Sequence, residues 1–200
     1  MKNLLIIIFL TPLFSCHDFD KKDTVENKLT IDVLPFNDIS KETVNRVFIE
    51  LKKIYPNIEL KQPMALPKSA YYLPRNRYRA DSLIRFIKNI TPKDHVTIAL
   101  TSKDISATKG KISDYGIMGL GYRPGNACVV STYRLSNENK FTELFKYCLH
   151  ELGHTSGLPH CPEKTCFMRD AEGGNPTNEE TDFCTKCKSH LISKGWLFEK

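Results

Sequence analysis

Hydrophobic and polar positions follow two different periods along the first three quarters of the chain. Alternation or short apolar runs, which are typical of strands, occur at residues 29–36, 58–60, 96–100 and 127–132. Apolar residues spaced as on one face of a helix occur at residues 41–54, 80–90 and 138–153. Strands that alternate with helices predict the α/β (α+β) class. We expect a mixed, mainly parallel sheet of four to five strands, with two or three helices.

The helix at 138–153 carries two distinct stripes, and Ser136 or Asn137 is its expected N-cap. The apolar stripe, which should face the core, comprises Phe141, Leu144, Phe145, Cys148 and Leu152. The second stripe, which should face a cleft, comprises Glu143, Tyr147, His150 and His154. This division is typical of a helix shared between a core and an active site.

The end of this helix carries the pattern HExxHxxGxxH. His150 and His154 are four residues apart, so their imidazoles project from one helix face and can bind one metal ion. Zn²⁺ is the metal expected at an open site of nitrogen ligands. Glu151 follows His150 and can face a metal-bound water without being a ligand, as a general base does.

A third histidine extends the motif beyond the helix. His160 reaches the same metal only if the chain turns back, and Gly157 is the residue at which that turn is expected. Pro159 prevents the helix from continuing. The spacing therefore predicts three protein ligands, His150, His154 and His160, with the fourth position open for water.

Six of the seven cysteines fall into two groups, and the seventh, Cys16, belongs to the N-terminal segment. Cys128 and Cys148 lie at apolar positions and are expected to be small buried side chains. Cys161, Cys166, Cys184 and Cys187 form a cluster whose spacing fits either a tetrahedral zinc site or disulfides. The surrounding segment is polar, so we expect a cross-link of either kind to supply its order, followed by a short terminal helix at 188–196.

The N-terminus predicts export. Residues 1–15 contain one basic residue and an unbroken apolar run too short to span a membrane, as in a signal peptide. Ser15-Cys16 resembles the end of a lipoprotein signal, which predicts lipidation of Cys16, with secretion without lipid as the alternative. Residues 16–28 are charged and aperiodic and read as a flexible tether. The expected location is the bacterial cell envelope.

The charge of the chain is mild. Its formal net charge is +6, and residues 1–15 carry only Lys2, so +5 remains after their removal. This balance permits attraction to anionic lipid or acidic peptides, and no nucleic-acid motif is present. We expect a monomer that binds a peptide or protein substrate and no nucleic acid.

The motifs together resemble the archaemetzincin (archaelysin) family of metzincin zinc metalloproteases. The resemblance rests on HExxHxxGxxHC, on Cys166-Phe167-Met168 and on Cys184-Thr185-Lys186-Cys187, and it covers roughly residues 30 to 190. It implies a metzincin-like catalytic domain at 29–198, with an N-terminal subdomain at 29–157 and a small irregular cysteine-rich subdomain at 158–198. It also implies a catalytic zinc on the three histidines and a structural zinc on the four cysteines. Met168 would supply the Met-turn below the catalytic zinc.

The chain also departs from this family. The Met168-to-Cys184 gap is slightly shorter than usual, which affects a loop and no ligand. Relatives are often intracellular, whereas this chain carries an export signal, and oxidising conditions favour disulfides. No tyrosine closely follows Met168, so no tyrosine ligand is expected.

Two function classes follow. The first is a zinc-dependent peptidase in which zinc-activated water attacks a peptide bond and Glu151 is the general base. The second is a catalytically weak zinc-holding binding or scaffold lipoprotein, which the intact Glu151 disfavours.

Residues 115–122 are an expected sheet edge to which substrate could add as a strand. Residues 71–79 either line the cleft or form a solvated loop with aromatic side chains packed beneath it. They include Tyr71, Tyr72, Arg75, Arg77, Tyr78 and Arg79.

Overall fold

The computed structural model describes residues 29–171 and 173–198 of the 200-residue chain. The predicted signal peptide, Cys16 and the tether up to residue 28 lie outside the described residues. Within the described part of the chain, no helix is long and apolar enough to cross a membrane.

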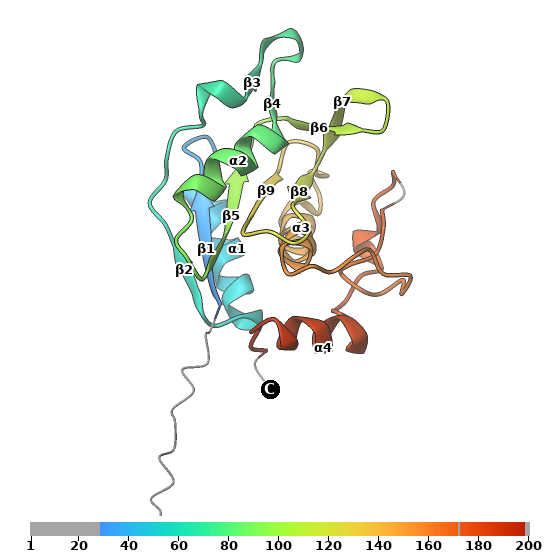
Figure 1. Ribbon diagram of the computed structural model, residues 1–200. Coiled ribbons are helices and arrows are strands. Elements are labelled where there is room, and N and C mark those ends of the chain that lie inside the picture. The colour runs from blue at the N-terminus through green and yellow to red at the C-terminus, as the bar shows by residue number, and fades with distance from the viewer. Residues whose placement is uncertain (1–28, 172, 199–200) are drawn as a thin grey trace, which may run out of the picture.

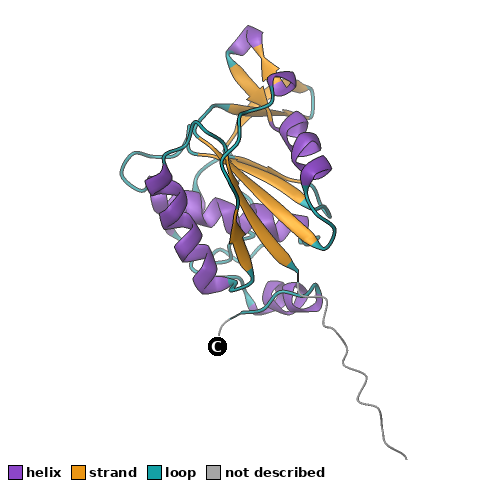
Figure 2. Cartoon of the chain, turned by 90° about the vertical axis from the view of Figure 1, so that its left-hand side faces the viewer, coloured by secondary structure: helices purple, strands orange, loops and turns teal. Residues whose placement is uncertain are grey.

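A five-stranded sheet forms the centre of the molecule (Figures 1 and 2). Its strand order is β2-β1-β5-β9-β8, and the first four strands are parallel while β8 is antiparallel at the edge. The strands are β1 Thr30–Pro35, β2 Ile58–Leu60, β5 His95–Thr101, β8 Gly119–Gly121 and β9 Ala127–Ser131. The predicted mixed, mainly parallel sheet is confirmed.

Helices cover both faces of this sheet. Helices α1 (Lys41–Ile54) and α3 (Lys140–Thr155) pack on one face, and α2 (Ala80–Ile90) packs on the other (Figure 2). A fourth helix of the described chain, α4 (Thr185–Ser193), lies below the sheet near the chain ends (Figure 1). It occupies the region of the short terminal helix expected at 188–196, but begins three residues earlier.

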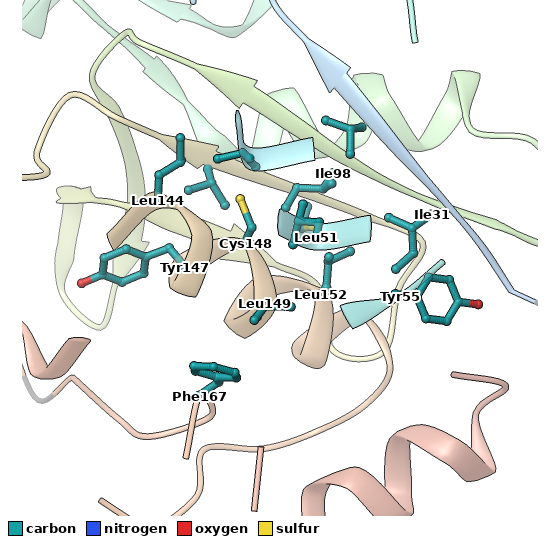
Figure 3. Close-up of a cluster of buried hydrophobic side chains, with 14 of the residues drawn as sticks. Ile31, Leu51, Tyr55, Ile98, Leu144, Tyr147, Cys148, Leu149, Leu152 and Phe167 are labelled. Carbon is teal, nitrogen blue, oxygen red and sulfur yellow. The ribbon is translucent and has the colours of Figure 1, made fainter. Parts of the chain in front are cut away.

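Side chains of the parallel strands are buried on both faces, as helix-covered parallel strands require. In β1, Val33 faces α1 and α3 while Leu34 faces α2, and β9 alternates in the same way with Val130 and Val129. Leu144, Cys148 and Leu152 of α3 point toward the sheet (Figure 3). The predicted apolar stripe of α3 therefore forms the core contact, and Cys128 and Cys148 are fully buried as expected.

A second, four-stranded sheet was not predicted. It has the order β3-β4-β6-β7, with strands β3 Tyr71–Tyr72, β4 Arg77–Arg79, β6 Ile105–Lys109 and β7 Ile112–Ile117. Its strands are short and several of its buried contacts are ionic, although Ile105 also packs in the core, so apolar periodicity does not reveal it. Arg77 is only 8% exposed and lies 3.1 Å from Asp104 and 3.5 Å from Asp114. Asp104 also accepts two hydrogen bonds from Arg134.

The boundaries of α3 differ from the expected ones. The helix runs from Lys140 to Thr155, and its N-cap is Asn139 instead of Ser136 or Asn137. Ser136 still takes part, because its hydroxyl accepts a hydrogen bond from the Asn139 amide. The Ser136 amide and hydroxyl in turn donate to the carboxylate of Glu143. A side-chain network before the helix thus replaces a simple cap.

The segment after α3 has few regular elements but is not without a core. Phe167, Met168, Phe183 and Trp196 are buried in the same cluster as α1 and α3. The Phe167 and Phe183 rings meet edge to face at 5.2 Å, and Trp196 packs at 5.2 Å from Tyr55. The segment therefore buries some apolar surface, since its aromatic side chains are widely spaced but converge, and the expectation that a cross-link at the cysteines completes its order stays a prediction.

Candidate metal centre and active-site cleft

The C-terminal end of α3 brings the three histidines of the motif together. Gly157 adopts a left-handed backbone (φ 94°), its amide donates to the carbonyl of His154, and the Leu158 amide donates to the carbonyl of Gly153. These bonds form a Schellman motif, which reverses the chain at the predicted glycine. His160 consequently lies beside the helix, with its ring centroid 5.3 Å from that of His150 and 5.0 Å from that of His154.

Each imidazole has an oxygen partner at Nδ1. His150 Nδ1 donates to the carbonyl of Phe167 at 2.7 Å, and His154 Nδ1 donates to the carbonyl of Leu158 at 2.8 Å. His160 Nδ1 lies 2.9 Å from a carboxylate oxygen of Asp170. These bonds fix the tautomer and leave Nε2 of each ring as the ligand atom. The sequence did not reveal Asp170, because no spacing links it to His160.

The donor set of this group fits Zn²⁺. The three candidate ligand atoms all lie within 4.8 Å of one another. Burial, followed by the neighbouring His154, lowers the pKa of His150 to about 3, and burial also lowers the pKa of His154. Neutral imidazoles are the form that binds a metal. Three nitrogen ligands with an open fourth position are typical of a catalytic zinc site.

Glu151 is buried beside this group, below the edge strand β8. A Cβ added at Gly119 would lie 2.6 Å from its carboxylate, and one at Gly121 would lie 2.6 Å from its carbonyl oxygen. Only glycine at both positions leaves room for the glutamate. Burial raises the pKa of Glu151 to about 8, and a hydrogen bond from the Gly121 backbone opposes this rise. A divalent cation next to the carboxylate would lower that pKa.

Met168 packs directly below α3. It is fully buried, and a Cβ added at Gly153 would lie 2.3 Å from its sulfur. Its carbonyl accepts a hydrogen bond from the Cys161 amide at 2.7 Å. The turn around Met168 therefore contacts both the helix that carries two histidines and the residue that follows the third.

The four clustered cysteines also come together. Their sulfur atoms all lie within 4.8 Å of one another, and none of them is disulfide-bonded. The sulfurs of Cys161 and Cys184 are 3.8 Å apart. A tetrahedral zinc site with Zn–S bonds of about 2.3 Å has sulfurs about 3.8 Å apart, whereas a disulfide bond is about 2.05 Å long. Four thiolates at this separation fit a structural Zn²⁺.

A cleft of about 450 Å³ borders the histidines. One wall comes from residues 115–119, the floor comes from α3, and the opposite wall comes from residues 169–171 and 173–176 with Glu180. None of the six tyrosines and arginines at 71–79 lines it. This segment is not a solvated loop either, because it forms β3 and β4 of the second sheet and buries Arg77. The polar stripe of α3 does line the cleft through Glu143, Tyr147 and His150.

Comparison with known proteins agrees with this geometry. The family model described as Peptidase family M54 matches residues 26–193. An archaemetzincin of Haloarcula marismortui is 28% identical over 176 residues, covering 81% of this chain and 99% of the relative. An archaemetzincin of Halobacterium salinarum is 30% identical over 178 residues, covering 80% and 98%.

Solved structures extend the likeness to the fold. The crystal structure of archaemetzincin from Archaeoglobus fulgidus, complexed with malonate, matches with a TM-score of 0.69 and 26% identity, covering 80% of this chain and 99% of that one. The archaemetzincin of Methanopyrus kandleri matches in fold with a TM-score of 0.70 and 24% identity, covering 84% and 96%. The chain therefore belongs to Peptidase family M54, the archaemetzincins, and is a zinc-dependent metallopeptidase.

Proposed function

We propose that His150, His154 and His160 hold the catalytic zinc of this peptidase and that Glu151 is its general base. The convergence of three Nε2 atoms, each ring being held through Nδ1 by an oxygen, carries the proposal. The neighbouring Glu151 carboxylate is buried and lies below two glycines. Of the other buried carboxylates that line the described cleft, Glu143 is bonded to Ser136 and Asn175, and Glu180 lies on the opposite wall.

The residues of the chain divide the reaction between them. When bound, zinc supplies Lewis acidity, which lowers the pKa of water and polarises the carbonyl of the scissile peptide bond. An Oε atom of Glu151 accepts the proton of the attacking water and returns it to the departing amine as the C–N bond breaks. The Phe167 and Leu158 carbonyls and the Asp170 carboxylate hold the imidazoles in place throughout.

The edge of the sheet is the proposed site of the substrate backbone. β8 (Gly119–Gly121) is the edge strand, and the residues just before it line the cleft. An extended peptide could add to this edge through main-chain hydrogen bonds, as strands do elsewhere. This placement would bring a peptide carbonyl next to Glu151 and the histidines.

A second zinc is proposed at the four cysteines, with a structural role. Cys161 follows His160 directly, and its sulfur lies with those of Cys166, Cys184 and Cys187. Whatever holds Cys161 also positions the third histidine. Two ions per chain with different ligand sets are therefore expected in metal analysis of the purified protein.

Anchoring by a lipid on Cys16 at the bacterial cell envelope remains a proposal that rests on the N-terminal sequence alone. The mature enzyme would then be a monomer tethered through residues 16–28. Mass spectrometry of the N-terminus of the native protein tests this. A modified Cys16 is expected, and an unmodified N-terminus elsewhere would exclude it.

The decisive experiment on the active site compares zinc binding with cleavage in Glu151→Gln. This variant should keep its zinc and lose about 10²- to 10⁴-fold in kcat/KM, the usual contribution of a general base. Glu163→Gln, which alters an exposed glutamate in the loop after His160, is the control and should cleave normally. Full activity of Glu151→Gln on every peptide cleaved by the wild type would rule out the assignment.

A further inference from the structure

The cleft continues along α3 beyond the catalytic end. Tyr147 precedes Glu151 by four residues, so it lies about 6 Å along the same helix face. Figure 3 shows its ring pointing away from the core side chains of Leu144 and Cys148. Across the cleft lies the segment that carries Glu180. This segment is fixed to the helix, because Lys146 Nζ donates to the carbonyls of Thr177 and Glu180, each at 2.5 Å.

Most charged side chains that line this cleft already have a partner. Lys109 lies over the ring of Tyr115. The paired cations are Arg134 with Asp104, Arg169 with Glu179, and Lys146 with the two carbonyls. The paired acids are Glu143 with Ser136 and Asn175, and Asp170 with His160. These groups therefore form the walls and leave little capacity for a ligand.

Glu180 and Tyr147 are the exceptions among the described residues. Glu180 is only 5% exposed, yet its carboxylate has no hydrogen bond and no ion pair within 4 Å in the described chain. Lys146 and Arg169 act on it only at longer range. Tyr147 is 9% exposed, and its hydroxyl has no hydrogen-bond partner there. Burial raises the pKa of Tyr147, and Glu180 is the carboxylate that contributes most to this rise.

Two buried polar groups that face one cavity call for a ligand that satisfies both. In the part of the chain that the structure describes, the Tyr147 hydroxyl is fully buried without a partner, which costs free energy, whereas the Glu180 carboxylate still reaches cavity water but has no partner from the protein. A suitable side chain would pair with both groups. An ionised carboxylate only accepts hydrogen bonds, and a tyrosine hydroxyl can accept one as well. Lysine and arginine side chains are pure donors, and their bonds to a carboxylate are charge-assisted. A neutral aliphatic or acidic side chain would leave Glu180 unpaired.

We propose that Glu180 and Tyr147 form a specificity pocket that binds a lysine or arginine side chain of the substrate, one helix turn from the scissile bond. The pocket selects peptides with a basic residue adjacent to the cleavage position. The Lys146 bonds position the Glu180 backbone for this role, and Tyr147 adds a neutral hydrogen-bond acceptor. The position relative to the scissile bond rests on the proposed role of Glu151.

Equilibrium binding tests the pocket without turnover. The zinc-loaded Glu151→Gln protein is titrated with short fluorescent alanine-glycine peptides, each carrying one lysine at a scanned position. Matched peptides carry norleucine, which has a similar length but no charge. At one position the lysine peptide should bind about tenfold more tightly than the matched norleucine peptide. A peptide with arginine at that position should show the same preference over norleucine. Equal affinities at every position would overturn the proposal.

Variants then assign the preference to residues. Adding Glu180→Gln should remove most of the tenfold difference, and Tyr147→Phe should reduce it about two- to fivefold. Glu163→Gln, which alters an exposed glutamate outside the cleft, is the control and should keep the preference. If Glu180→Gln weakened both peptides equally, the residue would be structural and the pocket assignment wrong.

The two proposals fail in different ways. Cleavage by the wild-type enzyme with no basic preference in binding would overturn the pocket and leave the role of Glu151 intact. A basic preference that depends on Glu180, in a protein whose cleavage is unaffected by Glu151→Gln, would support the pocket and overturn the assignment of the base. Metal analysis and circular dichroism of each variant confirm that the folded, zinc-loaded protein is compared.

Discussion

Between Thr30 and Thr155 the chain buries apolar side chains on both faces of one sheet. The described residues from Gly157 to Phe198 instead form one nine-residue α-helix, a short 3-10 helix and a series of turns. The first region is stabilised mainly by side chains that alternate regularly along parallel strands. The second contributes a few aromatic residues to that core and gathers four thiols at one point. Burial of apolar surface holds the first region, and the cysteine cluster adds a separate constraint on the second.

The proposed metal centre spans both regions. His150 and His154 belong to a helix of the first, while His160 and its partner Asp170 belong to the second. The cleft has the same division, because α3 forms its floor and residues 169–171 and 173–176 with Glu180 form a wall. Precise positioning of the third ligand therefore depends on the less regular region, and perturbing the two regions separately should have different consequences.

The largest effect is expected from Cys184→Ser. Removing one of four thiols should release the ion bound there, and the free energy of metal binding that orders this segment would be lost. The segment after Gly157 should become accessible to limited proteolysis, and catalytic activity should fall because His160 is no longer fixed. Metal analysis, proteolysis and cleavage assays on the same preparation measure this.

Cys128→Ala is the matched control for that experiment. Cys128 is a buried cysteine of β9, outside the cluster, so this variant should keep both metals and a protected C-terminal segment. If Cys184→Ser also retained its full metal content and protection, the cysteine cluster would not be what orders the segment.

The same contrast explains what the sequence could predict. The five-stranded sheet, its helices and the turn at Gly157 were predicted because each leaves a local signal, either an apolar period or a glycine at a helix end. The second sheet was missed because its strands are short and its buried ion pairs join residues far apart in sequence, such as Arg77 with Asp104 and Asp114. Pairing of distant charges leaves no periodic pattern.

The site divides similarly. The histidines, Glu151 and the cysteines were found because metal-binding chemistry needs those residue types at fixed short spacings. Asp170 and Glu180 were not found, since each is an ordinary acidic residue in a polar segment. Only the fold shows that one reaches His160 and the other lies buried in the cleft.

Leu144→Ala tests the first region. Leu144 is fully buried where α3 meets the sheet, so its truncation should lower the free energy of unfolding by about 2–5 kcal/mol. Denaturant unfolding of the zinc-loaded protein measures the loss, and metal stoichiometry should stay unchanged. Ile192→Ala, at a side chain 58% exposed on α4, should change stability by less than about 0.5 kcal/mol. Similar losses in the two variants would contradict the assigned core.

Gly153→Ala tests the contact between the two regions. The new methyl group would lie 2.3 Å from the Met168 sulfur in a fully buried site, so Met168 must move. We expect a net loss of about 1–2 kcal/mol, because overpacking outweighs the better helix propensity of alanine. A double-mutant cycle with Met168→Ala should show a favourable coupling, since the smaller side chain removes the clash. Additive effects would show that the two residues do not meet.

The smallest expected effect is a pH-dependent change in the free energy of unfolding, caused by Glu180 in the cleft wall. Burial raises the pKa of Glu180 to about 7 from 4.5, although Lys146 and Arg169 oppose this rise. Between these values the folded protein keeps a proton that the unfolded chain has lost, so the wild type loses stability as pH rises from 4.5 to 7. Because glutamine does not titrate, the Glu180→Gln variant should not lose stability in this way.

The variant should therefore match the wild type below pH 4.5 and exceed its stability above pH 7. The expected gain is about 1–2 kcal/mol, because cavity water screens part of the unfavourable charge. Comparing both proteins at each pH cancels the titration of the histidines, and Glu163→Gln controls for removal of an exposed charge. A gain at low pH, or none at high pH, would mean that the Glu180 carboxylate is already satisfied, and the pocket proposed for basic side chains would lose its unpaired acceptor.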